Sequence, residues 1–335
     1  MKFPSDIRLQ ITSRCNLNCQ HCFTSSSIQS NNGELSNAEF LSLVDQIADR
    51  GTEALSITGG EPLLRKELVL RILERFDGHP AVTTLNTSGW FVNMEMAKKL
   101  KEAGLQKVQI SLDSYDPKTH DRFRGMKDSH TRAIRAVEYC EKMGLETLVR
   151  TTITPYNFDS MPEILDLILT KGSQGLVVKP LIPSGRGLQM DEPLTYEQHK
   201  RAIIDLIDRI KMDSRVSQEY VHFLSPCLPF LIDSDFAVNA EKCECGERLA
   251  FITSMGDVQP CGYTHYVLGN ILEMPLRSIW TESRFLKNWE ENRISGKCKS
   301  CGFVQTCEGG CRTSAYETTG RLDVPDPMCW RREQH

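Results

Sequence analysis

Six short runs rich in β-branched and apolar residues recur along the first part of the chain, at 7–12, 53–58, 81–86, 107–112, 146–153 and 175–180. Between them lie stretches with helical spacing, such as 37–51 and 129–144, each closed by a glycine, as helix C-termini often are. Repeated strand–helix units with right-handed crossovers predict a parallel sheet. Six units fall short of a closed eightfold barrel. We therefore expect an α/β fold, a partial (β/α)6 barrel of the TIM type.

The cysteines are unevenly distributed, and this distribution predicts two domains. One group lies at positions 15, 19 and 22, another at 227, 243, 245, 261, 298, 301, 307, 311 and 329, with only Cys140 between. Cys140 shares the apolar face of its predicted helix with Ile134 and Val137, which indicates a small core residue. We expect a barrel domain over 1–215 and a small cysteine-rich α+β domain over 216–335.

Composition and charge limit the classes of partner that we expect for this chain. The chain has 40 basic and 44 acidic residues, a net charge of -4, which argues against nucleic acid as the main partner. Residues 1–10 lack the apolar region of a signal peptide, and no apolar run is long enough to span a membrane. We expect a cytoplasmic protein without a membrane partner. In that reducing compartment, 13 cysteines indicate metal ligands or catalytic groups rather than disulfides.

Three thiols directly follow the first predicted strand, at the end of the barrel where chemistry gathers in such folds. Cys15, Cys19 and Cys22 are spaced C-x3-C-x2-C. Three thiols cannot pair off as disulfides, and they are one ligand short of a closed tetrahedral metal site. Either a fourth ligand comes from elsewhere in the chain, or one coordination position is meant for a group that is not protein.

Other unusual residues collect at the same predicted edge. "TGGEP", residues 58–62, follows the second strand, and its adjacent glycines let the backbone approach a ligand closely. Glu61 adds a carboxylate suited to an ammonium group. "NTSG" (86–89) follows the third strand and "SLDS" (111–114) ends the fourth, both fit to bind hydroxyl groups. Each could be an ordinary turn, but their coincidence with the thiols favours a binding site.

C-x3-C-x2-C after the first strand, GGEP after the second and six β–α units resemble the radical S-adenosylmethionine (SAM) superfamily, over about residues 7–215. The resemblance implies that Cys15, Cys19 and Cys22 hold three irons of a [4Fe–4S] cluster, with SAM on the fourth. It also implies that SAM is cleaved reductively to a 5′-deoxyadenosyl radical, which takes a hydrogen atom from the substrate. No side chain is then expected to be the catalytic group, and an electron donor such as flavodoxin or ferredoxin is expected as a partner.

The resemblance further implies which residues contact SAM. Gly59, Gly60 and Glu61 are expected at its amino group. Ser111 and Asp113 are expected at its ribose or carboxylate.

Arginines and one histidine complete this expected set. Arg124 resembles an arginine that relatives use near the SAM carboxylate, although it could equally lie on a helix surface, and Arg150 is a competing candidate. Arg186 could face SAM or substrate, or be a plain loop residue. His21 occupies a position where the family often has a ring near the adenine.

The second cysteine group resembles the SPASM domain of many radical SAM enzymes. Its core, "CKSCGFVQTCEGGC", reads C-x2-C-x5-C-x3-C and is followed by Cys329. Upstream, Cys243 and Cys261 bracket a predicted hairpin that contains Gly256. The resemblance implies two auxiliary [4Fe–4S] clusters, and therefore three clusters in all. Since C-x2-C is also zinc-finger spacing, zinc is the alternative for this half of the chain.

The resemblance also implies how these ligands interleave. One auxiliary cluster would be held by Cys298, Cys301, Cys307 and Cys329. Cys311 would cross back to join Cys243 and Cys261 on the other. We favour Cys245 as the remaining ligand because it completes the count, with Cys227 or an open position as alternatives.

Three functions follow from these resemblances. SPASM enzymes mostly modify ribosomally made peptides, so we expect maturation of a peptide natural product or peptide-derived cofactor. With the first strand at residue 7, such a peptide could need a separate recognition protein. A smaller group with tails similar to residues 309–329 removes propionate carboxyls from haem precursors, so the alternative is a decarboxylase or dehydrogenase of a porphyrin-like or other small molecule. A non-catalytic iron–sulfur or zinc protein is the third possibility.

Overall fold

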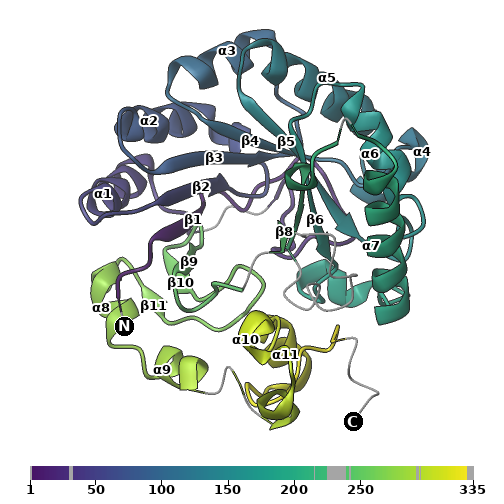
Figure 1. Ribbon diagram of the computed structural model, residues 1–335. Coiled ribbons are helices and arrows are strands. Elements are labelled where there is room, and N and C mark those ends of the chain that lie inside the picture. The colour runs from purple at the N-terminus through teal and green to yellow at the C-terminus, as the bar shows by residue number, and fades with distance from the viewer. Residues whose placement is uncertain are drawn as a thin grey trace.

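A computed structural model describes residues 2–29, 33–214, 216–224, 239–240, 243–291, 294 and 296–329. One sheet runs through this part of the chain in the order β11-β10-β9-β1-β2-β3-β4-β5-β6-β7-β8 (Figure 1). The strands are β1 (Asp6–Gln10), β2 (Ala54–Thr58), β3 (Val82–Thr87), β4 (Lys107–Ser111), β5 (Glu146–Ile153), β6 (Gly175–Pro180), β7 (Val221–Phe223), β8 (Asn239–Ala240), β9 (Leu249–Ile252), β10 (Asp257–Gln259) and β11 (Gly269–Asn270).

Helices connect these strands and form an outer layer around β1–β6 (Figure 1). In the barrel they are α1 (Asn37–Ala48), η1 (Pro62–Arg65), α2 (Lys66–Phe76), α3 (Met94–Glu102), α4 (Pro117–Arg124), α5 (Ser129–Lys142), α6 (Met161–Leu169), η2 (Gly185–Gln189), α7 (Tyr196–Lys211) and η3 (Gln218–Tyr220). After the sheet come α8 (Leu276–Thr281), α9 (Arg284–Glu291), η5 (Gly296–Ser300), α10 (Val304–Cys307) and α11 (Arg312–Thr319). No helix among the described residues has the length and apolar character that crossing a bilayer requires.

The predicted partial barrel is confirmed. All six predicted strands form, with bounds within two residues of those expected, and β1 to β6 pair in parallel in chain order. The helix expected over 129–144 forms as α5, where Cys140 is fully buried, as expected of a small core residue.

The C-terminal part of the chain adds strands at both ends of this sheet. β7 and β8 continue it in parallel after β6, and β9 pairs in parallel with β1. β9 and β10 form the hairpin that we predicted between Cys243 and Cys261. The sheet therefore contains strands from before and after residue 215. The division into two domains at this residue stays a prediction. β7, β8 and β11, which were not predicted, have two or three residues each and are too short to show a periodic pattern in the sequence.

Side chains of the barrel strands alternate between an apolar outer layer and a polar interior. Ile7 and Leu9 of β1 are fully buried in the apolar core, whereas Arg8 between them lines the central cavity. In β4, Val108 is likewise buried in the core and Gln109 lines the cavity. The alternation gives the barrel a dry layer beneath its helices and a polar interior that can hold a ligand.

Helix ends are fixed by local hydrogen bonds that the sequence encodes. At the start of α1, Ser36 Oγ accepts from the Glu39 N–H at 3.2 Å, and the Glu39 carboxylate accepts from the Ser36 N–H at 2.7 Å. Thr195 and Gln198 form the same capping box at the start of α7. These caps fix where the chain re-enters the outer layer after a loop.

Replacing Leu9 should destabilise the whole sheet, because β1 lies between β2 and β9 and the Leu9 side chain is fully buried. We expect Leu9→Ala to lower the free energy of unfolding by about 2–5 kcal/mol, measured by urea denaturation. Met212→Ala is the control, because Met212 is 82% exposed, and it should change that free energy by less than about 0.5 kcal/mol. Equal effects of the two substitutions would contradict this account of the core.

Candidate active site

The first cysteine group and one member of the second line a cavity of about 350 Å³ inside the barrel. Cys15, Cys19 and Cys22 line it from the loop after β1. Cys261, which follows β10, lines it as well. The parallel pairing of β9 with β1 brings the second group there, although the two groups are far apart in sequence.

The loop that carries Cys15, Cys19 and Cys22 is held by backbone hydrogen bonds to distant segments. The Cys15 N–H donates to the Ser27 carbonyl at 3.1 Å, and the N–H groups of Asn18 and Gln20 donate to carbonyls at the end of α4 at 3.1 and 3.0 Å. Cys15 and Cys19 are buried, and burial raises the pKa of the Cys15 thiol to about 12. Because a metal ligand must be a thiolate, metal binding here would displace protons.

The number and position of these three thiols suit an iron–sulfur cluster. Among the described residues, no group of three or more His, Cys, Asp or Glu side chains is arranged to hold one metal ion. The three thiols nevertheless share one cavity wall. A [4Fe–4S] cluster binds each thiolate to a different iron, so its ligands need not converge on a point. The residues present are therefore compatible with the predicted cluster.

The two glycines of "TGGEP" allow the loop after β2 to pack on the cysteine-bearing loop. The Gly60 N–H donates to the Thr12 carbonyl at 2.7 Å. A Cβ at Gly60 would lie 2.2 Å from the Arg14 carbonyl oxygen and 2.9 Å from Cys15 Cβ, and one at Gly59 would lie 2.9 Å from the Thr12 carbonyl oxygen. Both glycines line the cavity, as their predicted contact with SAM requires.

Glu61 is directed toward the loop after β3. Its fully buried carboxylate accepts from Thr87 Oγ1 at 2.7 Å and from the Ser88 N–H and Oγ at 2.9 and 2.5 Å. Burial raises the pKa of Glu61, while the hydrogen bonds from Ser88 and Thr87 act in the opposite direction. Glu61 thus ties two loops of the cavity edge together. Its contact with the SAM amino group stays a prediction.

Arg124 and Asp113, both expected near SAM, contact each other. Arg124 Nη2 lies 2.5 Å from Asp113 Oδ2, and Arg124 Nη1 donates to Cys19 Sγ at 3.8 Å. Burial lowers the pKa of Arg124, but the charges of Asp113 and Cys19 more than offset this, so the pKa is raised. Arg124 is buried and lines the cavity, which rules out the surface position considered for it. The arrangement places its charge beside a predicted cluster ligand.

The remaining predicted contacts also reach the cavity. Ser111 and Arg150 line it, and Arg150 Nη1 lies 3.4 Å from both Asn86 Oδ1 and Gln109 Oε1. Arg186, the loop arginine, donates to the carbonyls of Cys19 and Ser26 at 2.8 Å each. Arg186 therefore positions the cysteine-bearing loop and lines the cavity at the same time.

His21 is held flat against a second ring at the cavity wall. Its imidazole stacks on Phe123 with ring centroids 4.5 Å apart and planes 5° from parallel. Burial lowers the pKa of His21 well below its ordinary value, so the ring is neutral. The position suits packing against an aromatic ligand.

Sequence reasoning missed most of the charged lining. Six Lys or Arg side chains and one carboxylate, that of Glu146, line the cavity among the described residues; the six are Arg8, Lys107, Arg124, Arg150, Lys179 and Arg186. Arg8, Lys107 and Lys179 were not predicted. They occupy inward positions of β1, β4 and β6, so alternation along the predicted strands could have identified them. The cavity is strongly cationic, which favours an anionic ligand.

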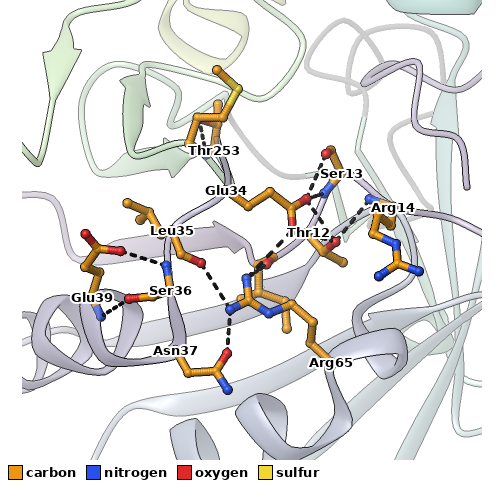
Figure 2. A network of polar contacts seen from close by, with 12 residues as sticks. Thr12, Ser13, Arg14, Glu34, Leu35, Ser36, Asn37, Glu39, Arg65 and Thr253 are labelled. Atoms are coloured by element: carbon orange, nitrogen blue, oxygen red, sulfur yellow. Dashed lines mark hydrogen bonds and ion pairs between the residues drawn. The ribbon is translucent and has the colours of Figure 1, made fainter. Parts of the chain in front are cut away.

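A second polar network, also missed, fixes the start of the cysteine-bearing loop (Figure 2). Glu34 accepts from Thr12 Oγ1 at 3.0 Å and from the Ser13 N–H and Oγ at 2.5 and 2.8 Å. Arg65, directly after "TGGEPLL", donates to the Ile11 and Leu35 carbonyls at 2.7 and 3.1 Å. No signal in a single sequence links these residues, because 21 to 54 positions separate the partners.

The second cysteine group is arranged in two sets. Cys245 forms hydrogen bonds with Cys243 and Cys261, and these raise its pKa well above the ordinary value. Cys311 forms one with Cys243. In the other set, Cys298 interacts electrostatically with Cys301, Cys307 and Cys329. These are the groups that we predicted for the two auxiliary clusters, and the ligand assignments stay predictions. Cys227, the alternative to Cys245, lies outside the described residues.

Comparison with known proteins matches both parts of the chain. The radical SAM superfamily matches residues 9–168, and the SPASM iron–sulfur cluster-binding domain matches residues 243–302. An AdoMet-dependent heme synthase of Methanosarcina barkeri is 30% identical over 337 residues, which are 97% of this chain and 96% of that protein. The mycofactocin maturase MftC of Mycolicibacterium smegmatis is 28% identical, over 97% of this chain and 82% of that protein.

The fold is also similar to solved structures. A structure of anSMEcpe with bound AdoMet superposes with a TM-score of 0.77, covering 97% of this chain and 94% of that one. Its sequence is 20% identical, so this likeness concerns the fold. It agrees with the partial barrel and the cysteine-rich C-terminal part described above.

An added methyl group at Gly60 should disturb the cysteine-bearing loop, because it would overlap the Arg14 carbonyl. We expect Gly60→Ala to lower the free energy of unfolding by about 1–3 kcal/mol and to reduce the iron bound per chain after anaerobic reconstitution. Gly187→Ala is the matched control, since its Cβ would have its nearest neighbour at 3.6 Å. Wild-type iron content and stability in Gly60→Ala would show that the close packing is not required.

Removing the Arg65 guanidinium should also destabilise the cysteine-bearing loop, because Arg65 binds the start of this loop. Arg65→Met leaves the Ile11 and Leu35 carbonyls without their donor, so the free energy of unfolding should fall by about 1–3 kcal/mol. Arg201→Met removes an arginine whose side chain is 66% exposed and should have an effect below about 0.5 kcal/mol. Thermal and urea unfolding measure both. A loss in Arg65→Met no larger than in the control would contradict the role assigned to Arg65.

Proposed function

Because the chain belongs to the radical SAM superfamily and carries a SPASM iron–sulfur domain, we propose that this enzyme acts on a carboxylate-bearing tetrapyrrole held in its central cavity. The observation that carries the proposal is the cavity itself, which the first cysteine group and Cys261 line and which is rich in Lys and Arg. The similarity to an AdoMet-dependent heme synthase over nearly the full length of both chains supports the same substrate class.

In this proposal the residues of the first cysteine group hold the cluster that binds SAM. When bound, that cluster supplies the electron that cleaves SAM and yields the 5′-deoxyadenosyl radical. Gly59 and Gly60 keep the loop after β2 against Cys15, and Arg186 holds the loop by the Cys19 carbonyl. Arg124 places a positive charge beside the Cys19 thiolate and stabilises it as a ligand.

The C-terminal cysteines are proposed to hold two auxiliary clusters. One would use Cys298, Cys301, Cys307 and Cys329, and the other Cys243, Cys245, Cys261 and Cys311. Cys261 at the cavity wall would then bring the second of these next to the substrate. With a cluster bound there, Cys261 and its partner cysteines would hold an acceptor for the electron that a substrate radical releases when its carboxylate leaves as CO2.

Apolar and charged residues of the cavity are proposed to bind different parts of the tetrapyrrole. Phe23, Leu148, Val177 and Phe251 line it and would pack against a flat macrocycle while excluding water. The cationic side chains would bind the peripheral carboxylates. We propose that the enzyme works in the cytoplasm and receives electrons from a donor such as flavodoxin or ferredoxin.

Peptide maturation is the second candidate, and the similarity to the mycofactocin maturase MftC favours it. An acidic peptide could use the same cationic cavity. A separate recognition protein would then present the peptide. Incubation with iron-coproporphyrin III separates the candidates, because only the first predicts loss of propionate carboxyls from this compound, detected by mass spectrometry.

Substituting a predicted cluster ligand should abolish the radical chemistry. Under anaerobic reduction with SAM, we expect the wild type to release methionine and 5′-deoxyadenosine, and Cys15→Ala to release neither. Cys140→Ala is the matched control, because Cys140 is buried in the core away from the cavity lining. The same low yield from wild type and Cys15→Ala would defeat the proposed function.

Iron analysis tests the cluster count separately. Three clusters predict about twelve irons per chain, whereas zinc in the second half would leave about four. Measurement of iron and zinc on the same anaerobic sample decides between them.

A further inference from the structure

Lys179 is a buried lysine among the cationic side chains that line the cavity. It lies in β6, is 8% exposed, and lines the central cavity. Its Nζ donates to Tyr263 Oη and lies 4.2 Å from the centroid of the Tyr263 ring. Tyr263 lines the same cavity and comes two residues after Cys261. The pair thus joins the barrel to the C-terminal part of the chain at the cavity wall.

Tyr263 is held rigidly in this position. Its ring packs against Phe23, with centroids 4.6 Å apart, and Ser184 Oγ donates to its carbonyl oxygen at 2.9 Å. Phe23 follows Cys22 directly in the sequence. The phenol therefore has a fixed location against Phe23, and it need not reorganise when a ligand arrives.

Lys179 is not paired with a carboxylate in the way that other cations of the cavity are. Arg8 pairs with Asp6 at 3.2 Å, Lys107 with Glu146 at 2.9 Å and Arg124 with Asp113 at 2.5 Å. Among the described residues, Lys179 forms no ion pair.

Burial lowers the pKa of Lys179 well below its ordinary value and the charge of Arg150 acts in the same direction, while the charges of Asp113 and Cys261 act in the opposite direction. A buried ammonium that forms no ion pair is costly, and a ligand carboxylate would reduce that cost.

We propose that Lys179 and Tyr263 form a binding subsite for one carboxylate of the substrate. Lys179 Nζ supplies the positive charge and Tyr263 Oη a second donor, and Arg150, which is close enough to Lys179 to affect it electrostatically, extends the positive surface. This inference rests on the proposed function, because it assigns the subsite to the substrate of the radical reaction. It makes Lys179 and Tyr263 determinants of specificity.

The main test compares tetrapyrrole binding by variants of the reconstituted enzyme. K179M keeps most of the side-chain volume without the charge, and we expect it to weaken the binding of iron-coproporphyrin III about 10- to 100-fold in an anaerobic absorbance titration. K179R, which restores a positive charge, should recover part of this loss. K98M is the control, since Lys98 lies outside the cavity lining with its side chain 65% exposed, and its affinity should stay within about threefold of wild type.

SAM also has a carboxylate, so its affinity is measured on the same samples by equilibrium dialysis. A loss in K179M that is confined to the tetrapyrrole supports the subsite. A similar loss of SAM affinity would assign the contact to SAM and overturn the proposal. Unchanged tetrapyrrole affinity in K179M would overturn it as well. Failure of the wild type to cleave SAM, in contrast, would defeat the proposed function and not the subsite.

A probe that does not depend on a tetrapyrrole substrate tests the subsite by itself. Sodium succinate should raise the melting temperature of the wild-type holoenzyme more than succinamide does at equal ionic strength, because only succinate carries carboxylates. Y263F and K179M should lose part or all of this difference, while each variant's melting temperature without ligand reports whether it folds. Absence of the difference in wild type, or its full persistence in K179M, would contradict a carboxylate subsite.

Discussion

The parallel pairing of β9 with β1 is the contact on which the arrangement of the cavity depends. Asp6 to Leu9 pair with Leu249 to Ile252, so a strand near residue 250 extends the edge of a sheet that began at residue 6. The hairpin that follows delivers Cys261 and Tyr263 to the cavity wall. A further bond, from the Leu35 N–H to the Ser254 carbonyl at 2.8 Å, fixes the β9–β10 turn against the segment before α1. Without this edge pairing, the two cysteine groups would not share one cavity.

Much of the barrel could be predicted because its strands are runs of five or more residues that are rich in β-branched and apolar side chains. Strands such as β5 and β6 are buried over most of their length and stand out in the sequence. β7, β8 and β11 are two or three residues long, and tertiary pairing rather than local pattern makes them strands. These three strands could therefore be identified only from the structure of the whole sheet.

In the candidate site, too, residues in short motifs could be predicted from the sequence, whereas contacts between distant residues could not. Spacing alone located the three cysteines after β1 and the two adjacent glycines, since short motifs carry them. It did not reveal that the Glu61 carboxylate would face Thr87 and Ser88, or that Arg124 would reach Cys19. These contacts join residues 26 to 105 positions apart, and a single sequence contains no signal for such pairs.

The shared wall of the cavity has an evolutionary consequence. The side that carries Cys15, Gly60 and Arg186 is locked by backbone packing and tolerates little change. The facing segment around Tyr263 reaches the cavity through side chains, one of which contacts Lys179. In the proposed subsite, Tyr263 thus places part of the selectivity in a different stretch of the gene from the first cysteine group, whereas Lys179 belongs to the barrel. Drift or recombination in the C-terminal stretch can change which molecule is accepted while the radical-forming half is inherited intact.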